Sequence, residues 1–229
     1  TGKPMRDLWI LRPDFIPTGV EPGVLEEWLT LARENNPEIR ARRKVLELAS
    51  LEVDRNRAGH LPQLDFVARA LRAENETLST LNQRSSITTV GVQLNVPLFA
   101  GGRVDALTGQ AVANRGRTLA ELDVAVNEVL TEVERQFLAV QTGVSKVAAY
   151  HKAVEASVVA VKGNQRGLAA GIRTNTDVLD AERQMFVARR DLAQARYEFL
   201  VSTLQLKAVA GVLSEKDVAE IEALLVAQY

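Results

Sequence analysis

The chain has 229 residues, a formal net charge of −1 and no cysteine. The near-zero charge argues against a nucleic-acid binder, which would carry a basic stripe. The lack of cysteine excludes disulfides, thiol nucleophiles and thiolate metal sites. No run of about eighteen apolar residues is present, so no membrane-spanning helix is expected. We expect no catalytic site, no cofactor and no metal site.

The N-terminal part predicts a connector followed by two helices. Residues 1–23 are rich in proline and glycine and are expected to be extended. A short amphipathic helix is predicted over 24–34, and the run Asn35-Asn36-Pro37 breaks it. A second helix is expected to reach about Arg57, because apolar residues recur every seven positions, at Ile39, Leu46 and Val53.

The apolar period then changes from that of a helix to two. Residues 64–71 alternate, and a clearer alternation follows in "TTVGVQLNVPLF", where one face carries Val90, Val92, Leu94, Val96 and Leu98. This pattern predicts an antiparallel strand pair, with the polar segment 72–86 as a long loop. Pro97, Gly101 and Gly102 mark the turn from the second strand into the next helix.

A very long helix is predicted from about Arg103 to Ala170, where no proline occurs. Its apolar residues keep a strict spacing of seven: Val112, Leu119, Val126, Val133, Val140, Val147, Val154, Val161 and Leu168. So sustained a period is typical of a left-handed coiled coil. His151 lies on the neighbouring seam, where we interpret it as a polar packing residue rather than a metal ligand.

A second long helix is predicted over about 175–209. Its large apolar residues also recur every seven positions, at Val178, Met185, Leu192, Phe199 and Leu206. A row of mostly small residues lies three positions further on, which favours close approach of two helices. Gly211 is expected to end this helix, and 217–227 predict a last short one.

The stretch "AAGIRTNTDVLDAE" (169–182) separates the two long helices. Gly171 can adopt the positive φ that closes a helix, and Thr174 followed by Asp177 fits a capping box. Capping explains Asp177 well. It explains Asp180 less well, because Asp180 lies one turn further into the helix.

The two long helices differ in length, at about 68 and about 35 residues. Half of the apolar seam of the longer helix therefore has no continuous partner within its own hairpin. The helix at 37–57 is expected to lie along a different flank of that helix. An isolated strand pair likewise leaves two unpaired edges and is marginal in water. Other chains, or a missing part of this one, should supply the partners.

Four stretches, in this order and at these spacings, resemble the TolC-like outer-membrane efflux and secretion channels of Gram-negative bacteria. They are "GHLPQLDF" (59–66), "NVPLFAGGRV" (95–104), "AGIRTNTDVLDAE" (170–182) and "ARYEFLVSTLQLKAVAGVLSEKDV" (195–218). Members of that family contain two tandem repeats, and three protomers build a twelve-strand barrel and a twelve-helix tunnel. The chain resembles the second, C-terminal repeat only. A fragment of such a protein is the leading interpretation, and a half-length protein that assembles as a hexamer is the alternative.

The resemblance implies a mainly α fold with one β-strand pair. A long antiparallel coiled-coil hairpin would join a two-stranded antiparallel segment that contributes to an oligomeric β-barrel and α-barrel. The expected segments are a connector with a short equatorial helix (1–36), an upper tunnel helix (37–60), the strand pair with an extracellular loop (61–101), the periplasmic hairpin with its tip near 168–180 (102–210) and a C-terminal equatorial segment (211–229).

The resemblance also implies roles at the tip of the hairpin. Asp177 and Asp180 match the carboxylates that line the periplasmic constriction. Arg173 matches the residue that holds the closed state through bonds to a neighbouring hairpin. The segment that would contact an adaptor is Gly171, Ile172, Arg173 and Thr174. Leu168 departs from the pattern, because a tyrosine stands there in the best-known member.

The implied function is a passive exit duct for tripartite drug efflux or type I protein secretion. It would lie in the outer membrane of a Gram-negative cell and extend into the periplasm. Its partners would be a periplasmic adaptor (membrane fusion protein), an inner-membrane pump or ABC exporter, outer-membrane lipid and further copies of itself, as a trimer in the full-length parent. Nucleic acid would not be a partner.

The alternative, from another class, is a periplasmic coiled-coil adaptor without a conducting pore. Such an adaptor also contains a long helical hairpin. It would show lipoyl-like and small β-barrel segments beside that hairpin, whereas the strand pair here favours the channel.

Overall fold

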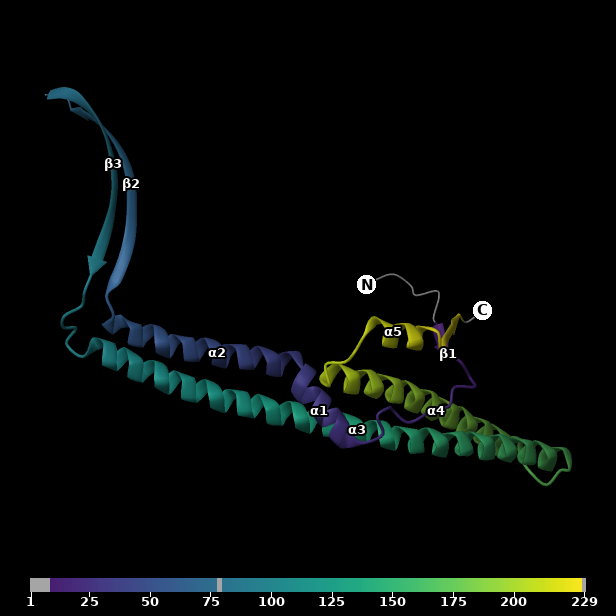
Figure 1. Ribbon diagram of the computed structural model, residues 1–229. Helices are drawn as coiled ribbons and strands as arrows, with labels where there is room; N and C mark the ends of the chain where they lie inside the picture. Colours follow the sequence, from purple (N-terminus) through teal and green to yellow (C-terminus); the bar gives the residue numbers. More distant parts are fainter. Residues whose placement is uncertain (1–8, 78–79, 228–229) are drawn as a thin grey trace. The chain divides into compact units, whose positions relative to one another are not determined.

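The computed structural model describes residues 9–77 and 80–227. The chain divides into two units, one formed by Thr1–Arg42 with Asp123–Tyr229 and the other by Arg43–Leu122 (Figure 1). Among the described residues, no helix combines the length and apolar character that crossing a bilayer requires.

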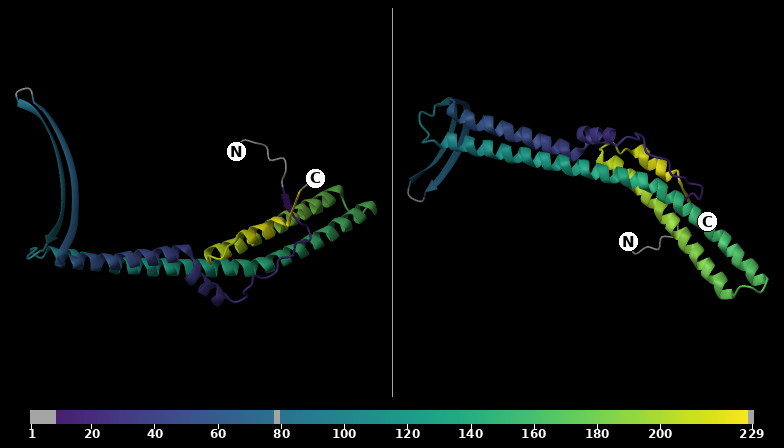
Figure 2. Two further views of the ribbon diagram at one scale, coloured as in Figure 1. Left: turned by 45° about the horizontal axis from the view of Figure 1, so that its top comes forward. Right: turned by 90° about the horizontal axis from the view of Figure 1, so that it is seen from below.

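The first unit is built on an antiparallel helical hairpin, whose arms lie side by side in both views of Figure 2. The arms are the C-terminal part of α3 (Arg103–Ala169) and α4 (Asn175–Val209). The seven-residue row of α4 faces the interior: Val178, Leu192, Phe199 and Leu206 are buried. The helices approach closely at Gly143, where a Cβ atom would stand 3.1 Å from the ring of Phe199. The predicted coiled-coil hairpin is confirmed.

The apolar seam of α3 is covered along only part of its length. Val133, Val140, Val147 and Val161 are buried in the first unit. In the second unit, Val112 and Leu119 continue the same row but are 41% and 48% exposed. The buried row there lies one position away, at Val104, Ala111 and Thr118. The large apolar residues of this stretch thus lack a partner in the described chain, as the mismatch in helix lengths predicts.

The N-terminal helices meet the end of α4 at a single asparagine. Asn36, between α1 (Leu25–Asn35) and α2 (Pro37–Arg57), is buried. Its Nδ2 donates to the carbonyl of Val209 at 2.7 Å, and its Oδ1 accepts from the backbone N–H groups of Glu38 at 2.8 Å and Ile39 at 3.1 Å. One side chain therefore caps the start of α2 and satisfies a carbonyl at the end of α4.

A short sheet joins two segments that are far apart in the sequence. Strand β1 (Trp9–Leu11) pairs antiparallel with β4 (Leu225–Ala227). The last helix, α5, covers only Glu215–Glu222. The connector is extended at β1, as predicted, although its pairing with β4 was not predicted. The prediction of a helix over 217–227 was wrong at β4. Three residues are too few to show a period, and their pairing depends on a partner more than two hundred positions away.

Helix α5 is tied to α4 by a charged pair. Lys207 donates a hydrogen bond to Asp217, whose carboxylate also accepts from the hydroxyl and backbone N–H of Ser214. These hydrogen bonds, with that from Lys207 the strongest, lower the pKa of Asp217 to about 2. The carboxylate is therefore ionised in the folded state at every pH above about 3.

We expect this pair to make stability depend on pH in the acid range. The folded-state pKa lies below the unfolded value, so the contribution is complete above about pH 4 and is lost as the pH falls toward 2. Its size should be about 2 kcal/mol at most. Urea unfolding of Asp217→Asn between pH 2 and 6 should show a weaker pH dependence than that of the unsubstituted chain. Asp123→Asn, which alters an exposed carboxylate, should leave the dependence unchanged, and equal effects of the two variants would contradict the assignment.

The second unit contains the predicted strand pair, and both strands are longer than expected. Strand β2 (Gln63–Thr77) pairs antiparallel with β3 (Thr80–Asn95). The pairing continues past Leu71↔Ile87 through the segment 72–86, so the prediction of a long loop there was wrong. Polar side chains hide the apolar period in this segment, while backbone hydrogen bonding continues regardless of side-chain type. Residues 78–79, where the predicted extracellular loop would be centred, lie outside the described residues.

The turn from β3 into α3 follows the prediction. Gly101 and Gly102 both have positive φ, at 58° and 77°, and α3 begins at the next residue. Pro97 lies just after the end of β3. At the same end of the strand pair, just before β2, a Cβ on Gly59 would stand 3.3 Å from the side chain of Val104. The chain just after the end of α2 therefore packs closely against the start of α3.

Candidate functional site at the hairpin tip

The tip of the α3–α4 hairpin is closed by backbone hydrogen bonds around a glycine. Gly171 has a φ of 74°, as predicted. The carbonyl of Gly167, in the last turn of α3, accepts from the N–H groups of Ile172 at 2.9 Å and Arg173 at 3.2 Å. The aliphatic part of Arg173 lies over Gly167, where a Cβ would come within 2.6 Å of its Cγ. The chain thus reverses in a tight turn whose positive φ at 171 favours glycine.

The first turn of α4 is capped as the sequence predicts. Asp177 Oδ2 accepts from the backbone N–H of Thr174 at 2.8 Å and from its hydroxyl at 2.9 Å, while Thr174 Oγ1 accepts from the N–H of Asp177 at 3.2 Å. These bonds, chiefly that from the Thr174 N–H, lower the pKa of Asp177, and the nearby charge of Arg173 acts in the same direction. The capping interpretation of Asp177 is confirmed.

Asp180 takes no part in the cap. It lies one turn further along α4 and its Oδ1 is 3.4 Å from a guanidinium nitrogen of Arg183, with 65% of the aspartate side chain exposed. Ile172, Arg173 and Thr174 are also exposed. The structure therefore brings the six predicted tip residues together and leaves most of them accessible to a partner. The constriction, the bonds of Arg173 to a neighbouring hairpin and the adaptor contact each require other chains and stay predictions. Pro97, Gly101 and Gly102 belong to the other unit.

A second apolar row at the tip was not predicted from the sequence. Ile172, Leu179 and Phe186 are spaced by seven residues and are exposed by 78%, 57% and 61%. Each lies one position after a member of the seven-residue row of α4 that contains buried Val178 and half-buried Met185. The seven-residue spacing was readable in the sequence, but it was masked by the stronger row beside it. This surface gives the hairpin a second face for packing against another helix.

We expect Thr174→Ala to lower the free energy of unfolding by about 1 kcal/mol, because it removes the hydroxyl that accepts from the N–H of Asp177. Chemical denaturation followed by circular dichroism would measure the loss. Thr176→Ala is the matched control, since Thr176 lies in the same turn but outside the capping box. An equal loss in both variants would mean that the capping box does not stabilise α4.

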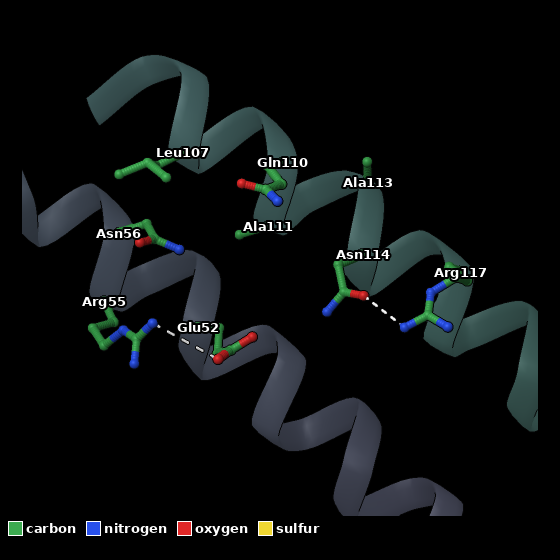
Figure 3. A pocket seen from close by; sticks show the side chains of 9 residues that line it. All are labelled: Glu52, Arg55, Asn56, Leu107, Gln110, Ala111, Ala113, Asn114 and Arg117. Carbon is green, nitrogen blue, oxygen red and sulfur yellow. Dashed lines mark hydrogen bonds and ion pairs between the residues drawn. The ribbon is translucent and has the colours of Figure 1, made fainter. Parts of the chain in front are cut away.

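A groove of about 510 Å³ lies between α2 and α3 in the second unit (Figure 3). The charged side chains that line it are paired along their own helices. Arg55 is 3.8 Å from Glu52, and Arg117 donates to Asn114 at 3.0 Å and to Glu121 at 2.8 Å. The groove therefore offers paired polar groups rather than a ready site. Across the described residues, no group of three or more His, Cys, Asp or Glu side chains is arranged to hold a metal ion.

The fold and the tip together define a class of protein: a long helical hairpin with a charged, capped tip, whose described residues leave large apolar side chains exposed. The chain belongs to the outer membrane efflux protein family, whose model matches residues 28–212. That family is one of outer-membrane channels rather than of enzymes. The predicted location, in the Gram-negative outer membrane with an extension into the periplasm, is confirmed by the family and its members.

Curated relatives support this assignment. The proteases secretion protein PrtF of Dickeya chrysanthemi is 36% identical over 97% of this chain and 49% of its own length. The alkaline protease secretion protein AprF of Pseudomonas aeruginosa is 34% identical over 94% of this chain and 45% of its own length. The outer membrane protein TolC of Vibrio cholerae is 30% identical over 86% of this chain and 46% of its own length. The chain thus spans about half the length of the curated relatives it matches.

Solved structures agree on the fold. A membrane protein from Pseudomonas aeruginosa matches with a TM-score of 0.68 and 21% identity, over 96% of this chain and 51% of that one. The CmeC outer membrane channel of Campylobacter jejuni matches with a TM-score of 0.69 and 14% identity, over 85% of this chain and 42% of that one. The resemblance to this family and the mainly α fold with a strand pair are therefore confirmed.

Proposed function

We propose that the chain is the C-terminal repeat of an outer-membrane exit duct. The duct is a passive conduit, gated at its periplasmic tip, and performs no chemistry of its own. This proposal rests on the family match over residues 28–212, and on a fold in which the N-terminal part of the α3 seam and the outer edges of the strand pair have no partner among the described residues. Further repeats, from a longer parent chain or from additional copies, would cover these surfaces.

The two faces of the strand pair suit a wall between lipid and water. One face pairs Leu64 with Leu94 and Phe66 with Val92, all of which are exposed in this chain. The other face pairs Asp65 with Gln93 and Arg69 with Thr89. Alternation of apolar and polar residues along each strand is typical of barrels with an aqueous interior.

The pattern of relatives favours type I protein secretion over drug efflux. The two relatives named for protease secretion are 36% and 34% identical to the chain. Relatives named for solvent and toluene efflux are 24% identical. The partners would then be a periplasmic adaptor that contacts Gly171–Thr174, an inner-membrane ABC exporter, outer-membrane lipid and further copies of the duct.

The first experiment is to measure the absolute mass of the purified chain in detergent and in plain buffer, followed by planar-bilayer recording. We expect a trimer or hexamer that needs detergent and shows discrete conductance. A monomer or dimer that is stable in buffer and does not conduct would contradict the proposal for this chain on its own. The duct function would then reside in a longer parent.

In a conducting assembly, we expect Asp180→Asn to weaken the preference for cations. Copies of Asp180 related by symmetry would form a ring of carboxylates, and such rings favour cation passage. Reversal potentials in a salt gradient measure this preference. Asp191→Asn is the matched control, because Asp191 lies on the same helix and is paired with Arg190 at 2.7 Å. An unchanged reversal potential in Asp180→Asn would place the constriction elsewhere.

A further inference from the structure

A pocket of about 300 Å³ lies in the first unit, where the N-terminal connector, α4 and α5 meet. Its apolar walls come from all three segments and include Phe15, Val20, Phe199, Leu204 and Ile221. The pocket shares no residue with the hairpin tip, and the duct function assigns it no role. What it can bind therefore depends on the chemistry of its own walls.

The connector wall of this pocket is held at both of its ends. Before the wall, the backbone N–H of Leu11 donates to the hydroxyl of Tyr197 on α4 at 3.0 Å. After it, Nε1 of Trp28 on α1 donates to the carbonyl of Pro22 at 2.7 Å. A cavity whose walls are fixed before binding loses little entropy when a ligand enters.

The α5 wall is held against α4 by the pair of Lys207 and Asp217, both of which line the pocket. Glu220 and Ile221 follow Asp217 by three and four positions, so they lie on the same face of α5. Lys207 is the one cation among the described residues that line the pocket. Its charge is already balanced, because its ammonium donates to the carboxylate of Asp217.

Two further carboxylates line the pocket and have no partner. Glu21 lies at the end of the connector wall and Glu220 on the α5 wall, and both residues are exposed. Within the described part of the chain, neither carboxylate forms an ion pair or a hydrogen bond. Because the third carboxylate, Asp217, is balanced by Lys207, the pocket keeps the two negative charges of Glu21 and Glu220. A ligand that enters can approach both, since both are open to solvent.

Two aromatic rings are a second feature that suits a cation. Phe15 and Phe199 both line the pocket, and their ring centroids are 6.3 Å apart. The face of an aromatic ring carries a negative potential that attracts ammonium groups, and its apolar area packs well against hydrocarbon. The carboxylates and the rings therefore favour the same kind of ligand.

We propose that this pocket binds an amphipathic organic cation, an ammonium group carried on an apolar body. The ammonium lies near Glu21 and Glu220. The body packs against Phe15, Leu204 and Ile221. A metal ion would leave the apolar walls uncovered, an organic anion would meet two uncompensated negative charges, and a neutral apolar molecule would make no use of the carboxylates.

The test uses the full chain in the state that the mass measurement identifies. An assembly that needs detergent is placed in nanodiscs of zwitterionic lipid, with empty nanodiscs as the blank, and a chain that is stable in buffer is used in buffer. The probes are 2-naphthylmethylammonium, its neutral match 2-naphthylmethanol and the anion 2-naphthoate, with binding measured by isothermal titration calorimetry at low salt.

We expect the ammonium probe to bind saturably and about tenfold more tightly than the alcohol. Two exposed carboxylates and two aromatic rings each add a modest attraction for a cation. The part that comes from the carboxylates should weaken as salt is added, because exposed charges are screened. 2-Naphthoate should bind more weakly than the alcohol.

A pair of double variants tests the role of the carboxylates. Glu21→Gln combined with Glu220→Gln should reduce the affinity for the ammonium probe to near that for the alcohol. Glu34→Gln combined with Glu222→Gln removes the same charge outside the pocket lining and should leave the preference for the ammonium probe in place.

A second pair tests the cavity itself. Leu204→Trp should fill the pocket and abolish binding of the ammonium probe and of the alcohol. Val201→Trp adds a large side chain on the same helix outside the pocket lining and should not. If Leu204→Trp fails to fold by circular dichroism, the carboxylate variants decide.

Three results would overturn the proposal. The first is a lack of saturable binding of the ammonium probe. The second is equal affinity for the ammonium probe and the alcohol, which would show an apolar pocket without cation recognition. The third is an unchanged affinity for the ammonium probe when both Glu21 and Glu220 are replaced. None of these results bears on the duct, which is tested by mass and conductance.

Discussion

Gly211→Ala is expected to lower the free energy of unfolding by about 3 kcal/mol or more. Gly211 follows the end of α4 with a φ of 73°, a conformation that alanine adopts at a cost. A Cβ there would stand 2.5 Å from the carbonyl oxygen of Asn35 and 2.8 Å from the backbone nitrogen of Asn36. Because backbone atoms cannot move aside as a flexible side chain can, the junction of α1, α2 and α4 would have to open.

Gly163→Ala is the matched control for Gly211→Ala. Gly163 lies within α3, and a Cβ there would meet nothing within 4 Å. Alanine should therefore raise the stability of α3 by about 0.5 to 1 kcal/mol. Chemical denaturation of both variants gives opposite signs if the junction is as described. A small loss in Gly211→Ala would show that the end of α4 is free to separate from Asn35.

Trp28→Ala should be similarly damaging, with an expected loss of about 4 kcal/mol. Only 1% of Trp28 is exposed, and its Nε1 donates to the carbonyl of Pro22 at 2.7 Å. Truncation leaves a large cavity under α1 and removes the bond that anchors the connector. Trp28→Phe keeps most of the packing and loses the hydrogen bond, so its loss should be intermediate.

Trp9→Ala is the control for the tryptophan prediction. Trp9 is 56% exposed, in β1, so its truncation should cost about 1 kcal/mol at most. Unfolding can be followed by tryptophan fluorescence, because each single variant keeps one tryptophan and its emission reports the environment of that residue. Equal losses in Trp28→Ala and Trp9→Ala would mean that the burial of Trp28 does not stabilise the fold.

Features set by local backbone chemistry were predicted from the sequence with little error. The start of α4 at Asn175, its capping box and the positive φ of Gly171 each depend on residues within a few positions of one another. The seven-residue row of α4 is likewise a property of one helix. The family could also be identified from four short stretches, because they preserve residue types at turns and helix ends.

From the sequence, only those contacts at the tip could be predicted that form within a single hairpin. Thr174 and Asp177 are neighbours in the first turn, so their contact was predictable. The role of Arg173 or Asp180 in gating depends on symmetry-related copies, whose positions no pattern within one chain encodes. The row formed by Ile172, Leu179 and Phe186 shows the same limit, because an apolar spacing does not say what covers it.

The sequence by itself determined the long helices, the cap of α4, the existence of the strand pair and the membership of the outer membrane efflux protein family. Only the tertiary structure decided that Val104 and Ala111, rather than Val112, are buried in the second unit, and that Trp9–Leu11 pairs with Leu225–Ala227. The physical reason is the separation along the chain of the residues that interact. Caps and periods arise from neighbours along the chain, whereas burial and pairing arise from residues that folding brings together across most of its length.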